Sequence, residues 1–363
     1  MKKVDPWFLG IVLLLTGVGF LIFSSAALGL LARDGGAQLS SVIFSQLFFG
    51  LGLGLSSFFV VSRINYKVWR KYAFYIFLFS VIATALVFVP KIGLELKGAA
   101  RWLSIGPFTV QPAEFLKIGL VLYLAAWFSA FRNKVHSLKY GLIPLFAFLG
   151  VVGFLLVKQP DTGTLVVLFA AAVGIFFTSG ARLRDVFTLI MVAIGGLAVI
   201  VYIKPYIQQR ILTFLNPFSD IQGAGWQIGQ ASIAIGSGGL FGRGFGQGVQ
   251  KFTYLPEPIS DSIFAVAAEE FGLVGALVII SLFVFFAVRG FHIAQRAPDY
   301  FSRLTVVGIV ILIAGQAFLN IGSMLGVFPL TGLPLPFISH GGTAMLFTFI
   351  GSGIILNISR YIK

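Results

Sequence analysis

The chain has 363 residues, of which 58% are hydrophobic and only 10% are charged. Soluble globular domains carry about 25% charged residues, so this chain has too few charges to cover the surface of a water-soluble enzyme. The absence of cysteine also excludes a disulfide-stabilised scaffold. A membrane-spanning helix uses about 20 residues, and the apolar content therefore limits the chain to about ten spans. The composition predicts an integral membrane protein.

Ten apolar runs follow one another along the chain. They fall at 8–30, 41–61, 72–90, 113–130, 140–157, 164–180, 186–203, 263–288, 304–325 and 341–358. The runs do not alternate polar with apolar residues, which argues against a transmembrane β-barrel. The first run resembles a secretory signal peptide, but it is too long for one and nine further runs follow it. We expect one all-α membrane domain over residues 1–363, with ten helices and an uncleaved first span.

The net charge of +14 has two possible causes, nucleic-acid binding and membrane topology. If the N-terminus lies inside, the short inner loops 63–71 and 132–139 are dense in lysine and arginine and nearly free of acid. This is the positive-inside pattern, in which basic loops stay in the cytoplasm. We therefore expect both termini inside and no nucleic-acid partner.

Three outer segments are polar and rich in glycine and proline, at 91–112, 204–262 and 326–340. The second is far longer than ordinary connections, and long loops are usually functional or disordered. Its aromatic residues, such as Trp226, Phe241 and Tyr254, argue against disorder. We expect a large structured extracytoplasmic loop between the seventh and eighth spans. A short amphipathic helix over 221–235 is expected to lie on the membrane surface.

Histidine is rare, at positions 136, 292 and 340, and cysteine is absent, which excludes a His/Cys metal site. The glycine-dense run 236–248 lacks the spacing of nucleotide-binding loops. Two interpretations of this run stay open. It is either a flexible turn or a backbone that approaches a phosphate closely, with Arg243 beside it.

Several ionisable residues are expected at membrane depth. Placing a charge there costs free energy, so such residues point to a functional site. Glu114 and Lys117 share one helix face at the start of the fourth run. They form either a mutually neutralising pair or part of a polar cavity. Glu269 and Glu270 lie about two turns into the eighth run, and at least one should face a polar interior. Asp161 is expected to cap the helix that follows it.

Asp261 stands where the long outer loop enters the eighth span, after a segment held rigid by two prolines. It is either an unremarkable helix cap or a general base held at the membrane surface. Nearby basic residues would suit an anionic lipid headgroup. These expected neighbours are Arg210, Arg243 and Lys251.

Six sequence blocks occur in order over nearly the whole chain. They are G-A-A-R-W-L at 98–103, Q-P-A-E-F-L-K at 111–117, Q-P-D-T-G-T at 159–164, G-L-F-G at 239–242, Y-L-P-E at 254–257 followed by Asp261, and G-L-P-L-P-F-I-S-H-G-G at 332–342. In these blocks the sequence resembles the SEDS family of shape, elongation, division and sporulation proteins, typified by FtsW and RodA.

The resemblance implies a ten-helix peptidoglycan glycosyltransferase of the cytoplasmic membrane. Such a protein polymerises lipid II on the outer face and works with a class B penicillin-binding protein. The family's essential aspartate falls on Asp261, and the Glu and Lys of its Q-P-x-E-x-x-K block fall on Glu114 and Lys117. The start of the chain and the block at 333–337 lean towards the division branch.

The chain departs from the family pattern at two places. Ile259 and Ser260 stand where the family usually has His-Thr, and His340 stands where it usually has Tyr. The first change removes a polar neighbour of Asp261, although the Ser260 hydroxyl is able to replace that of the threonine.

The expected mechanism is an inverting glycosyl transfer in which Asp261 acts as the general base. The remaining residues expected to bind substrate, besides Glu114, Lys117 and Ser260, are Arg101, Arg210, Arg243, Lys251, Glu257 and Ser339. The basic members of this set would stabilise the leaving pyrophosphate. A divalent cation is a possible helper, but no ligand cluster indicates one, and no other cofactor is expected. Alternative functions are a flippase for lipid-linked precursor, with Lys117 and Glu269 on its polar track, and a scaffold that recruits a transpeptidase.

Overall fold

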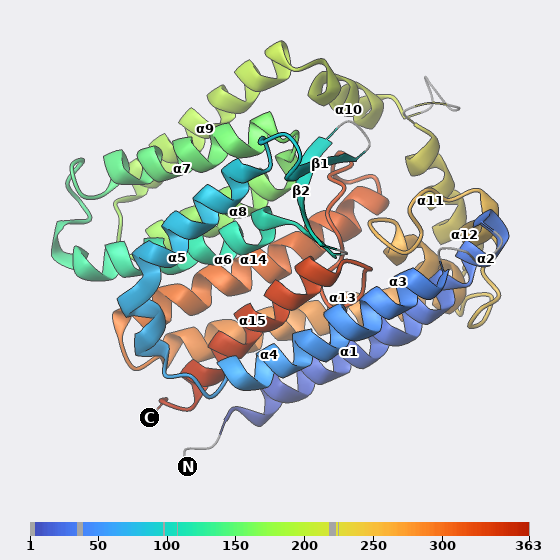
Figure 1. Ribbon diagram of the computed structural model, residues 1–363, viewed down its shortest axis with the longest axis horizontal. Helices are drawn as coiled ribbons and strands as arrows, with labels where there is room; N and C mark the ends of the chain where they lie inside the picture. Colours follow the sequence, from blue (N-terminus) through green and yellow to red (C-terminus); the bar gives the residue numbers. More distant parts are fainter. Residues whose placement is uncertain are drawn as a thin grey trace.

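The computed structural model describes residues 4–34, 39–96, 99–106, 108–217, 223 and 225–362. Helices build its body (Figure 1). They are α1 (Pro6–Ala27), α2 (Gly29–Asp34), α3 (Leu39–Ser45), the π-helix η1 (Gln46–Leu53), α4 (Gly54–Val61), α5 (Tyr66–Leu86), α6 (Pro112–Ala130), the short 3₁₀-helix η2 (Arg132–Lys134), α7 (Leu142–Lys158), α8 (Thr162–Thr178), α9 (Leu183–Ile203), α10 (Pro205–Leu215), α11 (Trp226–Ser237), α12 (Gln250–Thr253), α13 (Ile263–Gln295), α14 (Tyr300–Met324) and α15 (Gly342–Ser359).

The helical membrane class expected from the composition is confirmed. Among the described residues, eight helical segments are long and apolar enough to cross a membrane. The helices α7 and α8 have 17 residues each and lie where the fifth and sixth spans are expected. The count of ten spans stays a prediction. The expected second span is formed by α3, η1 and α4 in direct succession, so its middle is a π-helix.

Helix α14 occupies the centre of the bundle, where it packs against α6, α8, α13 and α15. Helix α9 lies at the edge, and only Asp185, Val186 and Leu189 of its residues are buried (Figure 1). Polar groups that are removed from water are costly unless they are hydrogen-bonded. Any polar side chain on α14 therefore has to be satisfied by the elements that surround this helix.

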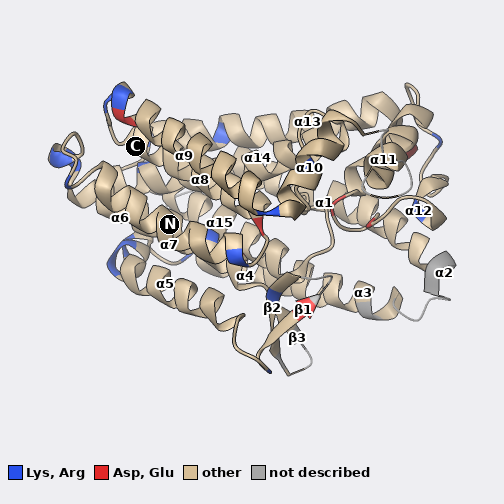
Figure 2. Ribbon diagram, turned by 90° about the horizontal axis from the view of Figure 1, so that it is seen from above, with Lys and Arg blue, Asp and Glu red and all other residues tan. Residues whose placement is uncertain are grey.

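The two ends of the chain meet at one end of the bundle. The backbone N–H of Asp5 donates to Ser359 Oγ at 3.0 Å, and the Asp5 carboxylate forms an ion pair with Arg289 at 2.5 Å. Figure 2 shows lysine and arginine residues, in blue, in the loops at this end. Both observations agree with termini on one basic, inner side of the membrane.

The first outer segment contains a small sheet that the sequence analysis did not predict. Strands β1 (Gly93–Leu96), β2 (Ala99–Ile105) and β3 (Phe108–Val110) form an antiparallel sheet in the order β1-β2-β3. Gly93 pairs with Leu103, and Leu103 pairs with Val110. This sheet adds a β element to the expected all-α class and carries Arg101 on its middle strand.

The long outer loop is structured, mainly by helices α10, α11 and α12 (Figure 1). The expected short helix over 221–235 corresponds to α11, which begins at Trp226. Residues 221, 222 and 224 lie outside the described residues. Helix α10 was not expected from the sequence.

The eighth span is not the uniform helix that the sequence predicted. Helix α13 breaks at Gly272, which has φ 64° and ψ −164°. A break leaves backbone groups without helical partners, and the glycine-dense run satisfies them. Its N–H groups donate to the carbonyls before the break, and its carbonyls accept from the N–H groups after it. The donor–acceptor pairs are Arg243 to Glu269 and Gly244 to Glu270, both at 3.0 Å, and Leu273 to Gly239 and Val274 to Leu240, at 2.9 and 3.1 Å. The run is a clamp around the break.

We predict that Gly272→Ala destabilises the protein. A Cβ at this position would lie 2.3 Å from the backbone nitrogen of Gly242, and the backbone conformation itself costs on the order of 1–3 kcal/mol for a residue with a side chain. Gly315→Ala in α14 is the control, because its Cβ would meet no atom within 4 Å. Thermal unfolding in detergent should show a large loss for Gly272→Ala only. Equal melting temperatures for the two variants would contradict the clamp.

Candidate functional site

Asp261 lies at the outer end of α13, between the Y-L-P-E segment and the helix. The capping position of α13 belongs to Ser262, so the interpretation of Asp261 as the helix cap is wrong. The Asp261 carboxylate is half-buried, and its Oδ2 accepts a hydrogen bond from Gln227 Nε2 at 3.1 Å. The same Gln227 nitrogen donates to Ser262 Oγ at 3.0 Å. Helix α11 of the outer loop therefore orients this carboxylate.

Two outer loops, at 254–262 and 332–340, are joined by hydrogen bonds around Asp261. Ser339 donates from its Oγ to the carbonyl of Ser260 at 2.5 Å, and the N–H of His340 donates to the carbonyl of Ile259 at 2.7 Å. The Glu257 carbonyl accepts from the N–H groups at 260 and 262, at 3.1 and 3.2 Å. These bonds give Ser339 a structural task. Substrate contacts of Ser339, Ser260 and Glu257 stay predictions.

Two arginines bring positive charge to this region. Arg101 donates to the carbonyls of Gln159 and Pro160, and Arg210 donates to a loop carbonyl at position 330, 3.2 Å away. Burial lowers the pKa of the Arg210 guanidinium, and Arg101 lowers it further, while Asp161 and Asp261 act in the opposite direction. The structure thus brings together four charged side chains from four different segments of the chain, namely Arg101, Asp161, Arg210 and Asp261.

Asp161 caps α8 as the sequence predicts, because its Oδ1 accepts from the N–H of Thr164 at 3.3 Å. Its second oxygen, Oδ2, is buried and has no hydrogen-bond partner among the described residues. This carboxylate also interacts electrostatically with Arg210. Its position beside the arginines goes beyond the capping role that the sequence indicated.

Lys251 is fully enclosed, with 0% of its surface exposed. Its ammonium group donates to Glu270 Oε1 at 2.5 Å, to Ser25 Oγ at 2.8 Å and to the carbonyl of Gly246 at 3.1 Å. An ammonium group has three donors, and all three are occupied. The expected contact between Lys251 and a pyrophosphate is therefore not supported. Lys251 neutralises a buried carboxylate and ties the outer loop to α1.

Glu269 is buried, and its carboxylate also binds groups of the outer loop. Its carboxylate accepts from the N–H of Val249 at 2.8 Å and lies 3.9 Å from Arg243 Nε. Both glutamates lie before the break at Gly272 and contact the outer loop, so they do not line a track through the membrane. The Arg243 side chain is 43% exposed and keeps access to solvent.

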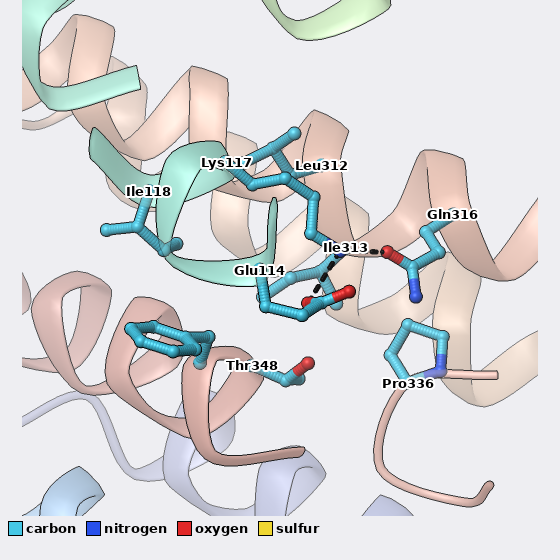
Figure 3. A pocket seen from close by; sticks show the side chains of 9 residues that line it. Glu114, Lys117, Ile118, Leu312, Ile313, Gln316, Pro336 and Thr348 are labelled. Carbon is cyan, nitrogen blue, oxygen red and sulfur yellow. Dashed lines mark hydrogen bonds and ion pairs between the residues drawn. The ribbon is translucent and has the colours of Figure 1, made fainter. Parts of the chain in front are cut away.

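Glu114 and Lys117 form a buried ion pair of 2.7 Å, and Lys117 Nζ also donates to Gln316 Oε1 at 2.6 Å (Figure 3). The pair lines a cavity of about 20 Å³ together with residues of α14, α15 and Pro336. A volume of this size holds about one water molecule. Glu114 and Lys117 therefore neutralise each other and also line a cavity, which are the two roles that the sequence left open. Its contact with substrate stays a prediction.

Three amide side chains that were not predicted from the sequence organise the site, namely Gln227, Gln316 and Asn320. Asn320 Nδ2 donates to the carbonyls of Asp261 and Leu333, at 2.8 and 2.7 Å. Two amides four residues apart in an apolar span were a usable signal, because polar residues are rare inside membranes. Across the described ranges, no three His, Cys, Asp or Glu side chains gather to hold a metal ion. The divalent cation considered as a helper stays a prediction.

We predict that Lys251→Met strongly destabilises the protein. It leaves the Glu270 carboxylate buried without a countercharge, a change that costs about 3–5 kcal/mol. The double variant Lys251→Met/Glu270→Gln removes both charges and should recover much of the loss in thermal unfolding experiments. A double variant no more stable than the single one would show that the ion pair is not what Lys251 contributes.

We predict that His340 makes the stability pH-dependent. Burial lowers the pKa of His340 below its usual 6.5, while Glu257 opposes the shift. The unfolded chain then binds a proton that the folded state resists, so stability falls as the pH drops below about 6.5. His340→Tyr should melt with a smaller difference between pH 7.5 and pH 5.5 than the unsubstituted protein. The control His136→Tyr changes an exposed side chain and should keep the full difference. Equal pH dependence in all three proteins would contradict this role.

Comparisons with known proteins agree with this arrangement. Residues 6–363 match the profile of the FtsW/RodA/SpoVE family, described as cell cycle proteins. The chain is 38% identical over 366 residues to a probable peptidoglycan glycosyltransferase FtsW of Trichlorobacter lovleyi, covering 100% of this chain and 95% of that protein. It is 36% identical over 316 residues to the stage V sporulation protein E of Bacillus subtilis, covering 87% and 86%.

Solved structures show the same fold. The rod shape determining protein RodA of Thermus thermophilus superimposes with a TM-score of 0.72 at 27% identity, covering 99% of this chain and 97% of that one. A chain from a peptidoglycan synthase complex that coordinates polymerization and crosslinking gives a TM-score of 0.73 at 28% identity, covering 95% and 97%. Taken with the profile match over nearly its whole length, this chain belongs to the FtsW/RodA/SpoVE family of multi-pass membrane proteins.

Proposed function

We propose that this protein is a peptidoglycan glycosyltransferase that polymerises lipid II at the outer face of the cytoplasmic membrane. The observation that carries the proposal is the setting of Asp261. Its carboxylate is half-buried between two joined loops, oriented by Gln227 and electrostatically coupled to Arg210. The relatives named as peptidoglycan glycosyltransferases support the same reaction.

The proposed reaction is a single displacement. Asp261 accepts the proton of the acceptor 4-hydroxyl while the hydroxyl oxygen attacks the anomeric carbon of the donor sugar. The bond between that carbon and the pyrophosphate oxygen breaks, and the pyrophosphate keeps the electron pair. Attack from the opposite side inverts the anomeric configuration. A positioned general base contributes a rate factor of about 10²–10⁴.

The leaving pyrophosphate carries its own negative charge and needs no acid to protonate it. Arg210 interacts electrostatically with both Asp261 and Arg101, and Arg243 is exposed on the outer loop. Guanidinium groups bind phosphate oxygens through paired hydrogen bonds and stabilise charge that develops in the transition state. We assign the pyrophosphate to these arginines, with Glu257 and the Ser260 hydroxyl on the sugar side. No step is assigned to a metal ion.

The proposed partner is a class B penicillin-binding protein, which crosslinks the strand that this protein makes. Support comes from the structural neighbour that belongs to a peptidoglycan synthase complex, whose described role joins polymerization to crosslinking. Among the described residues, the two charges assigned to a flippase track are engaged in other contacts. Lys117 is paired with Glu114 and Gln316, and Glu269 is bound by the backbone of the outer loop.

Polymerisation of lipid II tests the proposal. The purified chain with its transpeptidase receives labelled lipid II, and glycan strands are resolved by electrophoresis. We predict that Asp261→Asn lowers the rate at least 100-fold, because an amide does not accept the proton. Glu95→Gln is the matched control, since it removes an exposed outer carboxylate on β1 and should polymerise normally.

Two outcomes would contradict the proposal. Normal polymer from Asp261→Asn would remove the general base from the mechanism. Transport of lipid II into the outer leaflet of vesicles, without any polymer from the unsubstituted protein, would favour the flippase.

A further inference from the structure

Helix α14 carries two buried amides one turn apart, Gln316 and Asn320, and each connects segments that are distant in sequence. Helix α14 is surrounded by other helices, and 4% and 0% of these two side chains are exposed. Buried amides are costly unless their hydrogen bonds are made, so the partners of these two groups are structurally informative.

Asn320 connects the two loops that form the site. Its Nδ2 donates to the backbone carbonyl of Asp261 at 2.8 Å and to the carbonyl of Leu333 at 2.7 Å. Both protons of one amide nitrogen are thus used to hold two different loops. A displacement of Asn320 would move the backbone of Asp261 relative to the loop at 333–340.

Gln316, one turn before Asn320 on α14, connects the loop at 332–340 to Lys117 on α6. Its Nε2 donates to the carbonyl of Pro334 at 2.8 Å, and its Oε1 accepts from Lys117 at 2.6 Å (Figure 3). Lys117 in turn is paired with Glu114. Residues 333 and 334 are neighbours in the chain, so the contacts are continuous from Glu114 on α6 to Asp261.

We propose that Asn320 is a positioning residue for Asp261, and that the Glu114–Lys117 pair acts on the site through Gln316 rather than by touching substrate. The inference rests on the proposed function of Asp261. Glu114 and Lys117 are 2% and 6% exposed and line a cavity of about 20 Å³. This burial leaves little of either side chain for contact with a sugar or pyrophosphate.

The physical reason for this arrangement is the geometric demand of proton transfer. A general base has to lie within hydrogen-bond reach of the hydroxyl it activates, and a displacement of about 1 Å can cost about 100-fold in rate. The outer loops carry Asp261, and loops are more mobile than the helices that they connect. Anchoring the loop backbone to a central helix supplies the rigidity that the reaction requires.

Steady-state kinetics of lipid II polymerisation separates positioning from binding. Asn320→Leu and Gln316→Met are close in volume to the original side chains and remove the amide without burying a charge. We expect kcat to fall at least tenfold in each, with KM for lipid II within threefold of the unsubstituted protein. Ser179→Ala is the control, because it removes a buried hydroxyl at the C-terminal end of α8 that donates to the carbonyl of Phe176 and touches none of these residues. It should change neither constant by more than twofold.

A double-variant comparison tests the route from Lys117. If the pair acts through Gln316, the charge-free variant Glu114→Gln/Lys117→Met, Gln316→Met and the combination of all three share one loss of kcat, because residues in one network are not additive. If Lys117 touches substrate, its substitution raises KM and adds to the loss from Gln316→Met. Additive effects of this kind would overturn the inference for the pair.

The outcomes also separate this inference from the proposed function. Activity of Asp261→Asn at the normal rate would remove the function and the inference together. An inactive Asp261→Asn with a normal kcat in Asn320→Leu would overturn the positioning role alone. Because Asn320→Leu leaves two carbonyls unpaired and folds less stably, binding of labelled lipid II is measured as well. Retained binding with lost turnover supports positioning, and lost binding contradicts it.

Discussion

Buried backbone carbonyls and N–H groups have to be paired wherever packed helices and lipid exclude water, and this constraint shapes the outer end of the molecule. Helix α13 breaks at Gly272, and the glycine-dense run supplies partners for the groups that the break releases. The carbonyls around Asp261 receive side-chain donors instead, from Asn320 and Ser339. Each of these hydrogen bonds also fixes the position of a loop. The bonds that satisfy buried backbone groups therefore also hold the site together.

The buried charges follow the same rule. Lys251 and Glu270 neutralise each other behind the outer loop, and Glu114 and Lys117 do so at membrane depth. A buried ion pair adds little net stability but is very costly to break, so such pairs hold the elements that carry them in one relative position. Because these lysines are occupied internally, the proposed reaction assigns the pyrophosphate to the arginines, of which Arg210 interacts electrostatically with Asp261 and Arg243 keeps access to solvent. The basic residues that were expected to bind substrate therefore differ in role, because the two lysines neutralise buried carboxylates, whereas the arginines are proposed to bind the pyrophosphate.

Much of this architecture could be predicted from the sequence, because apolar runs of span length and basic loops report directly on membrane insertion. The position of Asp261 at the entry to α13 and the cap at Asp161 followed from local pattern. The sheet at 93–110 and the break at Gly272 did not, since both depend on partners distant in the chain. The burial of Lys251 was missed for a related reason. Its partner Ser25 lies on another helix, and sequence spacing carries no information about that contact.

Hydrogen exchange of backbone amides shows whether the site is assembled before substrate arrives. The N–H groups of Ser260, Ser262 and His340 donate to carbonyls within the two joined loops. In lipid nanodiscs without substrate, these amides should exchange slowly, as the amides of α14 do, and they should exchange much faster in Asn320→Leu. Rapid exchange of all three in the unsubstituted protein, slowed only when lipid II is added, would contradict the account.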